Sequence, residues 1–98
     1  MITSKQRAYL RKLANPIDPI FQIGKDGISE NFVKQISDAL EARELIKIHI
    51  LESSFLDARD TVNELARLTQ AEAVQAIGSK IVLYRESRNK KQIELPKK

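Results

Sequence analysis

The chain has 98 residues, of which 42% are hydrophobic and 31% are charged, and it contains no cysteine. This length and composition are typical of one soluble globular domain, and the lack of cysteine excludes disulfides and thiolate metal sites. No apolar run approaches the ~18–20 residues that span a membrane, and the basic start of the chain lacks the apolar core of a secretory signal, so we expect a cytoplasmic protein.

The first predicted element is a helix that begins at Ser4. Thr3 and Gln6, on either side of this start, have the spacing of a capping box. Asn15-Pro16 ends the helix, because the residue before a proline avoids the helical region. The apolar run at residues 20–24 then predicts a short strand that ends at Gly24.

A second helix is predicted after Gly27, with Ser29 as its N-cap. Apolar residues recur at helical spacing through this segment, and Glu44 lies at its end or just beyond it. In residues 45–51 three isoleucines alternate with Lys47 and His49. That alternation predicts a strand with one well-buried face.

The rest of the chain predicts a helix and two strands. Residues 52–56 are a loop, and Asp57 is the expected N-cap of the third helix. Residues 71–78 and 80–87 predict strands joined by a hairpin turn at Gly78-Ser79. In the mostly polar tail, residues 92–95 can add an edge strand or pack on the surface.

The expected fold is therefore a compact α/β single domain of order α-β-α-β-α-β-β over residues 1–98. Helices connect the earlier strands and a hairpin connects the last two, so we expect a mixed four-stranded sheet.

Charge is distributed unevenly along this chain of net charge +4. Residues 1–25 carry five basic side chains against one acidic, and residues 80–98 carry seven against two, whereas residues 26–79 carry five against ten. If the two basic ends meet in the fold, they form a positive face that suits a polyanion. The alternative is a solvated surface with basic termini.

The segment Gly24-Lys25-Asp26-Gly27 lies between a predicted strand and the start of a helix. Glycine allows positive φ and close approach of another chain, and a helix N-terminus favours an anion. Lys25 adds a mobile positive charge. A G-x-x-G loop in this setting clamps single-stranded nucleic acid in KH domains, although four residues with two glycines are also a common turn.

Basic side chains outside the loop can contact phosphates, or can simply be solvated. The candidates lie on the first helix, on the helix after the loop and beside the last strand: Arg7, Arg11, Lys12, Lys34, Lys80 and Arg85. Phosphate contacts carry little sequence information, so selectivity would come from RNA shape or unpaired bases. Tyr84 can stack on a base, but a core position is more usual for a strand aromatic.

Patterns for catalysis or metal binding are weak. His49 is the one histidine, it lies in mid-strand, and no serine has a nucleophile-elbow context, so we expect no enzyme. His49 could approach a phosphate if its face of the sheet is open. Asp57, Asp60 and Glu64 share helical spacing but are typical of an acidic first turn. We expect no metal, no cofactor and no small-molecule substrate.

Longer motifs resemble a known family. The spacing L-x-x-x-A-x-x-x-x-P-x-x-x-x-G-x-x-G runs from Leu10 to Gly27, and it is followed in order by "ALEARELIK" and "IGSKIVLYR". Together they resemble the CRM domain, the RNA-binding module of chloroplast splicing factors and bacterial ribosome-maturation proteins, and above all its stand-alone bacterial YhbY-like members. The resemblance covers about residues 3–96, and a short basic tail completes the chain.

This resemblance implies a fold similar to the C-terminal domain of bacterial translation initiation factor three. It also implies that residues 24–27 face RNA, and that the RNA belongs to precursors of the large ribosomal subunit. Asp26 is unusual at such a loop, because a carboxylate repels phosphate unless it turns back to accept backbone N–H groups.

Two other function classes stay open from the sequence. The acidic middle of the chain could contact a protein partner, with the basic ends incidental. A small enzyme would depend on His49 as its general base. For the oligomeric state we expect a monomer.

Overall fold

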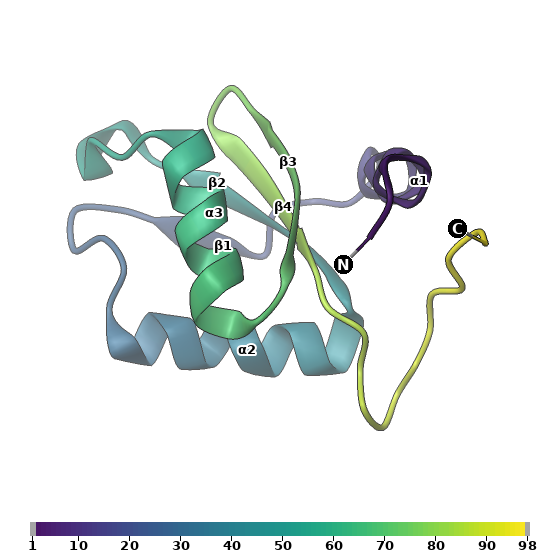
Figure 1. Ribbon diagram of the computed structural model, residues 1–98. Coiled ribbons are helices and arrows are strands. Elements are labelled where there is room, and N and C mark those ends of the chain that lie inside the picture. Colours follow the sequence, from purple (N-terminus) through teal and green to yellow (C-terminus); the bar gives the residue numbers. More distant parts are fainter. Residues whose placement is uncertain (1, 98) are drawn as a thin grey trace.

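The computed structural model describes residues 2–97 (Figure 1). Its elements follow the expected order: α1 (Ser4–Ala14), β1 (Phe21–Ile23), α2 (Glu30–Arg43), β2 (Leu45–Ile50), the 3₁₀ turn η1 (Glu52–Ser54), α3 (Ala58–Thr69), β3 (Glu72–Ile77) and β4 (Lys80–Tyr84). The prediction of three helices and four strands is confirmed.

The four strands form one mixed sheet in the order β1-β2-β4-β3. Strands β1 and β2 are parallel, with Phe21 opposite Ile48, whereas β4 is antiparallel to both of its neighbours. Helix α2 supplies the crossover between the parallel pair, and a two-residue turn at Gly78-Ser79 joins β3 to β4. Gly78 has φ +57°, a conformation for which glycine is well suited.

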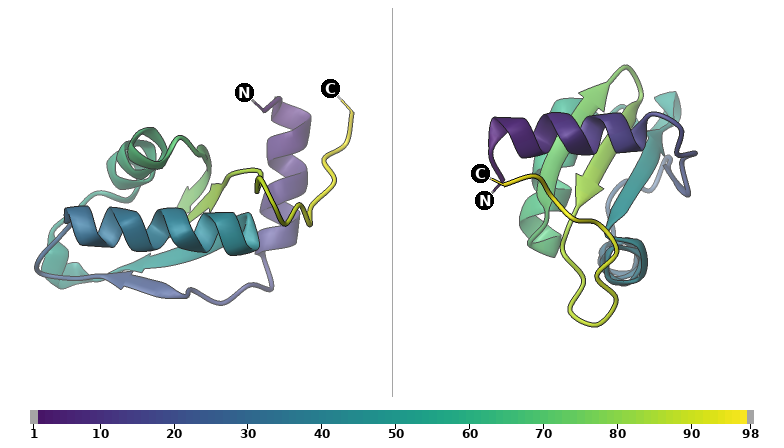
Figure 2. Two further views of the ribbon diagram at one scale, coloured as in Figure 1. Left: turned by 90° about the horizontal axis from the view of Figure 1, so that it is seen from below. Right: turned by 90° about the vertical axis from the view of Figure 1, so that its right-hand side faces the viewer.

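Helices cover both faces of this sheet (Figure 2). On one face, α2 and α3 pack over a core that includes Ile36, Ile48 and Leu65. On the other, α1 packs over a second cluster built around Leu10, Val82 and Tyr84. Strand β2 contributes to both cores because Ile46, Ile48 and Ile50 point to one face and Leu45 to the other.

The predicted helix starts are confirmed at the level of individual hydrogen bonds. Thr3 and Gln6 form a reciprocal capping box at α1, with distances of 3.0 and 3.1 Å. The Ser29 hydroxyl accepts from Phe32 N–H at the start of α2, and the Asp57 carboxylate accepts from Asp60 N–H at the start of α3. These side chains satisfy amide groups that a helix leaves without intrahelical partners.

The tail after β4 crosses the sheet end and returns to α1. Ile93 and Leu95 pack against the α1 core, and the Gln6 side chain donates to the Pro96 carbonyl at 2.9 Å. Residues 92–95 therefore pack on the surface and do not form an edge strand. As a result, the two ends of the chain lie close together (Figures 1 and 2).

Within residues 2–97, no helix has both the length and the apolar composition needed to cross a bilayer.

Candidate nucleic-acid interface

The glycine segment forms a tight turn between the end of β1 and the start of α2. Gly27 N–H donates to the Gly24 carbonyl at 3.0 Å, and Gly27 has φ +66°. A side chain at Gly27 would meet no atom within 4 Å, so the glycine serves its backbone conformation and leaves the surface open. Two residues later, Ser29 caps α2, which places the positive end of that helix beside the turn.

Both sides of the turn are held firmly to the body of the protein. Phe21 on β1 and Phe32 on α2 meet edge to face, with ring centroids 5.9 Å apart. Leu51 N–H donates to the Ile23 carbonyl at 2.9 Å. The turn is therefore presented on a fixed base, which lowers the entropy cost of binding through it.

Amide side chains surround the turn. A shallow hollow of about 260 Å³ lies beside it, and its walls include Gln22, Asn31 and Gln35. These side chains can both donate and accept hydrogen bonds, so they can contact sugar, phosphate or base edges. The sequence pattern alone did not single out these three amides. The i, i+4 spacing of Asn31 and Gln35, just after the glycine loop, indicates that both amides lie on one face of the helix.

Two of the predicted basic residues, Lys25 and Lys34, lie in the turn and on the helix that follows it. Lys25 is exposed within the turn, and Lys34 is exposed on α2 one helical turn beyond Asn31. Lys80 starts β4 opposite His49 and lines a separate hollow with Asn15 at the end of α1. Asp26 is exposed as well, and its carboxylate accepts no hydrogen bond from the residues described, 2–97.

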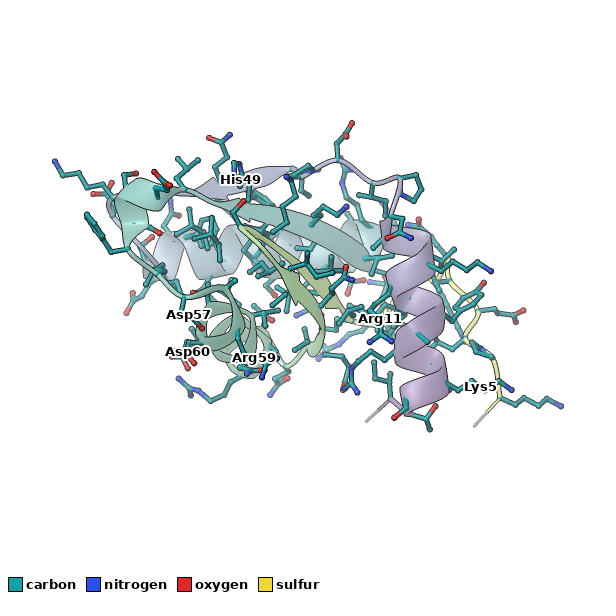
Figure 3. The ribbon with its side chains drawn as sticks, turned by 90° about the horizontal axis from the view of Figure 1, so that it is seen from above. Lys5, Arg11, His49, Asp57, Arg59 and Asp60 are labelled. Atoms are coloured by element: carbon teal, nitrogen blue, oxygen red, sulfur yellow. The ribbon has the colours of Figure 1, made fainter. Side chains whose placement is uncertain are left out.

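The basic residues of α1 lie elsewhere. Arg11 and Lys12 are exposed, and Arg7 Nε donates to the Ala73 carbonyl on β3 at 3.1 Å. Helix α1 and the glycine turn occupy opposite ends of a molecule whose longest dimension is 39 Å (Figures 1 and 2). Figure 3 shows Lys5 and Arg11 at the α1 end, far from Asp57, Arg59 and Asp60 where α3 begins. The predicted basic set therefore divides into two groups.

Arg85 is used inside the fold. Its guanidinium donates to the Ser37 hydroxyl and carbonyl and to the Thr69 carbonyl, at 2.7–3.0 Å. These bonds tie the end of β4 to α2 and α3. The side chain therefore serves the structure, and it is not placed at the glycine turn.

One row of side chains crosses the sheet on the face that α1 covers in part. Gln22, His49 and Lys80 stand opposite one another on β1, β2 and β4. His49 is half-buried and points outward on this face (Figure 3). Tyr84, by contrast, is buried in the α1 core, and burial beside Glu44 and Glu86 raises its pKa to about 12. It is a core aromatic.

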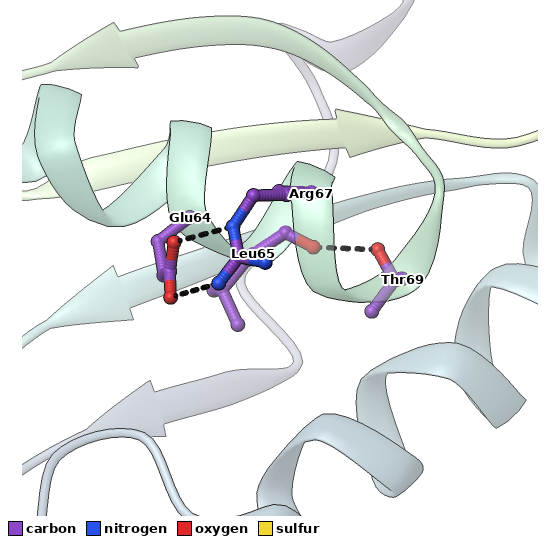
Figure 4. Close-up of polar contacts among 4 residues, drawn as sticks. All are labelled: Glu64, Leu65, Arg67 and Thr69. Atoms are coloured by element: carbon purple, nitrogen blue, oxygen red, sulfur yellow. Dashed lines mark hydrogen bonds and ion pairs between the residues drawn. The ribbon is translucent and has the colours of Figure 1, made fainter.

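Of the acidic residues at helical spacing, Asp57, Asp60 and Glu64, two have local roles in the structure of α3. Asp57 caps the helix, and Glu64 makes a two-pronged ion pair with Arg67 at 2.7 and 3.0 Å, while Thr69 closes the helix end by donating to the Leu65 carbonyl (Figure 4). The Arg67 guanidinium lowers the pKa of Glu64. Among residues 2–97, no group of three or more histidine, aspartate or glutamate side chains could hold a metal ion.

The sequence model of the CRS1/YhbY (CRM) domain matches residues 2–85. The chain belongs to this family. The matched range includes the glycine turn and all four strands.

CRM relatives match the chain from end to end. "Probable RNA-binding protein YqeI" of Bacillus subtilis is 49% identical over 98% of this chain and 100% of its own length. An "RNA-binding protein" of Haemophilus influenzae is 35% identical over 99% and 97%, respectively. The solution structure of a hypothetical protein from Staphylococcus aureus is 58% identical over 98% of this chain and 100% of that one, with a TM-score of 0.82. This protein therefore has the fold of the Staphylococcus aureus protein.

Proposed function

We propose that this protein binds ribosomal RNA in precursors of the large ribosomal subunit and assists assembly without catalysing a reaction. The RNA backbone lies on the glycine turn at residues 24–27, with Lys25, Lys34 and Lys80 as phosphate contacts. The protein acts as a monomer in the cytoplasm. Support for RNA as the partner comes from the family and from the names of its relatives.

The observation that carries the proposal is the position of Gly27 between a strand end and a helix N-terminus. Gly27 has no side chain, which leaves the backbone of the turn bare, while the first amides of α2 and the Lys25 ammonium supply positive potential. A phosphate can approach such a backbone closely and is favoured by the helix dipole. Contacts of this kind bind RNA with little sequence preference.

Helix α1 offers a second cationic surface at the other end. Arg11 and Lys12 are exposed there in the last turn of the helix. The basic ends of the chain thus meet at α1, as the charge distribution predicted they could, but away from the turn. A long RNA could contact both surfaces, whereas a short oligonucleotide at the turn would contact only one.

Charge reversal separates these contacts and tests the proposal. We expect Lys25→Glu to reduce retention of the protein on large-subunit precursors in a low-salt sucrose gradient, and high salt to release the wild type. Arg11→Glu with Lys12→Glu measures the contribution of α1, and Arg59→Glu is the control for a change of net charge. A wild-type protein that stays at the top of the gradient at every salt concentration contradicts the ribosomal target.

A protein-interaction role is one of the alternative functions that the sequence leaves open. In that case the acidic middle of the chain, including α3, would contact the partner. Lys25→Glu would then leave partner capture intact, while Asp60→Lys would abolish it. The two variants therefore distinguish the two functions.

A further inference from the structure

Phe55 is the most exposed large apolar side chain of the described residues, with 95% of its surface open to solvent. It follows η1 and has φ +57°, in the left-handed region. A bulky residue rarely adopts this conformation, because its Cβ crowds the following carbonyl. Phe55 therefore lacks the burial that usually explains an aromatic residue, and its backbone is strained.

The segment around Phe55 is ordered by its own hydrogen bonds. Phe55 N–H donates to the Glu52 carbonyl at 3.0 Å, and the Ser54 hydroxyl donates to the Leu51 carbonyl at 2.7 Å while accepting from Leu56 N–H at 3.2 Å. These bonds hold the turn while the ring stays in solvent. Strain that the surroundings maintain in this way is found at functional sites.

This segment lies directly against the glycine turn. Leu51 N–H is bonded to the Ile23 carbonyl, and a methyl group built on Gly24 would lie 3.6 Å from Leu51 Cδ1 and 3.9 Å from Ser53 Oγ. Phe55 is two residues beyond Ser53, so their Cα atoms are at most about 7 Å apart. Figures 1 and 2 show η1 and the glycine turn at the same end of the molecule.

We propose that Phe55 is a stacking platform for an unpaired RNA base next to the nucleotides whose backbone lies on the glycine turn. This proposal rests on the proposed function, since it assigns a base contact to the same binding site. An exposed aromatic face beside a backbone-binding turn is the pairing that single-strand binding proteins use, and any base can stack there. The turn would hold phosphate while Phe55 holds a base.

The charges around Phe55 favour a base over a phosphate at this position. Glu52 and Asp57 flank it in sequence and are exposed, and they repel phosphate. A base carries no charge and gains by leaving water for an aromatic face. Leu56, 38% exposed, is the next exposed apolar side chain along this segment, which gives a small apolar area and not a broad protein-docking face.

Substitutions at Phe55 test the proposal with a labelled single-stranded RNA of about twelve nucleotides. We expect Phe55→Ala to weaken binding by about tenfold in fluorescence anisotropy, and Phe55→Leu to weaken it nearly as much, because leucine is apolar but has no aromatic face. Tyr9→Ala, which removes an exposed aromatic from α1, and Ile77→Ala are matched controls expected to change affinity less than twofold.

A direct readout follows from the absence of tryptophan in the chain. Phe55→Trp introduces a single tryptophan. We expect this variant to bind RNA with wild-type affinity, and the stacked base to quench the tryptophan fluorescence. An abasic nucleotide scanned along the RNA should abolish quenching at one position. These measurements do not depend on whether Phe55→Ala changes stability.

The outcomes separate this proposal from the proposed function. RNA that binds in a Lys25-dependent manner, with unchanged affinity for Phe55→Ala and no tryptophan quenching, overturns the stacking role alone. If Phe55→Leu binds RNA as tightly as the wild type, residue 55 makes a simple apolar contact, and the stacking role is overturned. Failure of the wild type to bind RNA at any salt concentration overturns both proposals.

Discussion

The carboxylate of Glu44 accepts a hydrogen bond from the backbone N–H of Ser87 at 2.7 Å, although the two residues are 43 positions apart. The other oxygen of the same carboxylate accepts from Gln92 and Ile93 N–H, each at 2.7 Å. Glu44 is fully buried at the end of α2. One buried side chain therefore organises the tail that returns to α1.

Replacing this carboxylate by an amide should destabilise the protein. In Glu44→Gln the side-chain NH₂ would face backbone N–H donors, so at least one buried donor would lose its acceptor. We expect a loss of about 2–3 kcal/mol in the free energy of unfolding, measured by urea denaturation. Glu64→Gln, at an exposed ion pair, is the control and should cost less than about 1 kcal/mol. Equal losses for both variants would contradict the role of Glu44.

Acid should weaken the same tail contact. Burial raises the pKa of Glu44, but the N–H groups of Ser87, Gln92 and Ile93 outweigh it, so the pKa is lower than its usual 4.5. The folded state then binds this proton less readily than the unfolded state. The stabilisation is complete above about pH 5 and is lost as pH falls through the folded-state pKa. Urea titrations across this range should show a steeper fall for wild type than for Glu44→Gln, and parallel curves would refute the linkage.

Replacing Gln70, at the end of helix α3, by glycine should stabilise the protein. Gln70 ends the helix with φ +57°, where a non-glycine residue is strained. We expect Gln70→Gly to raise the free energy of unfolding by about 0.5–1 kcal/mol, because relief of the left-handed strain exceeds the entropy cost of glycine. Asn15→Gly at the end of α1 is the matched control, since Asn15 has φ −52° and should gain nothing. Thermal denaturation of both variants checks this prediction.

Gly27→Asp should lower RNA affinity in a protein that still folds. The added side chain meets no protein atom within 4 Å, but its charge would face the phosphate and its backbone would be strained at φ +66°. We expect an affinity loss of about tenfold, measured by anisotropy. Gly27→Asn adds a side chain of nearly the same shape without the charge, so the difference between the two variants measures the contribution of charge to the affinity loss. A folded Gly27→Asp variant with wild-type affinity would remove the turn from the interface.

Asp26→Asn should have the opposite effect on affinity. The Asp26 carboxylate is exposed in the turn, so it repels a phosphate placed there. Removing one charge should raise RNA affinity by about two- to fivefold at low salt, and the gain should shrink as salt screens the charge. Asp38→Asn, exposed near the middle of α2, makes the same change of net charge away from the turn. An equal gain for both variants would indicate a general charge effect.

Local features of the fold were predictable from short segments. Thr3, Ser29 and Asp57 cap their helices as their spacing predicted, because a cap involves only residues within one turn. The alternation from Leu45 to Ile50 likewise predicted the strand, since side chains on a strand alternate between its faces. The glycine turn is also a local feature, because its position depends only on the strand before it and the helix after it.

The membership of the site was decided by tertiary contacts. Lys25 lies in the glycine turn and Lys34 on the helix that follows it, whereas Lys80 lines a hollow with Asn15 at the end of α1 and Arg85 bonds to α2 and α3. Gln22 lines one hollow with Asn31 and Gln35 because β1 ends beside α2, and the segment before Phe55 lies against the turn because Leu51 bonds to Ile23. The periodicity of a segment determines which face of a helix or sheet a residue occupies. Strand order and crossover direction decide which end of the sheet the residue lies at, and therefore which other residues it meets.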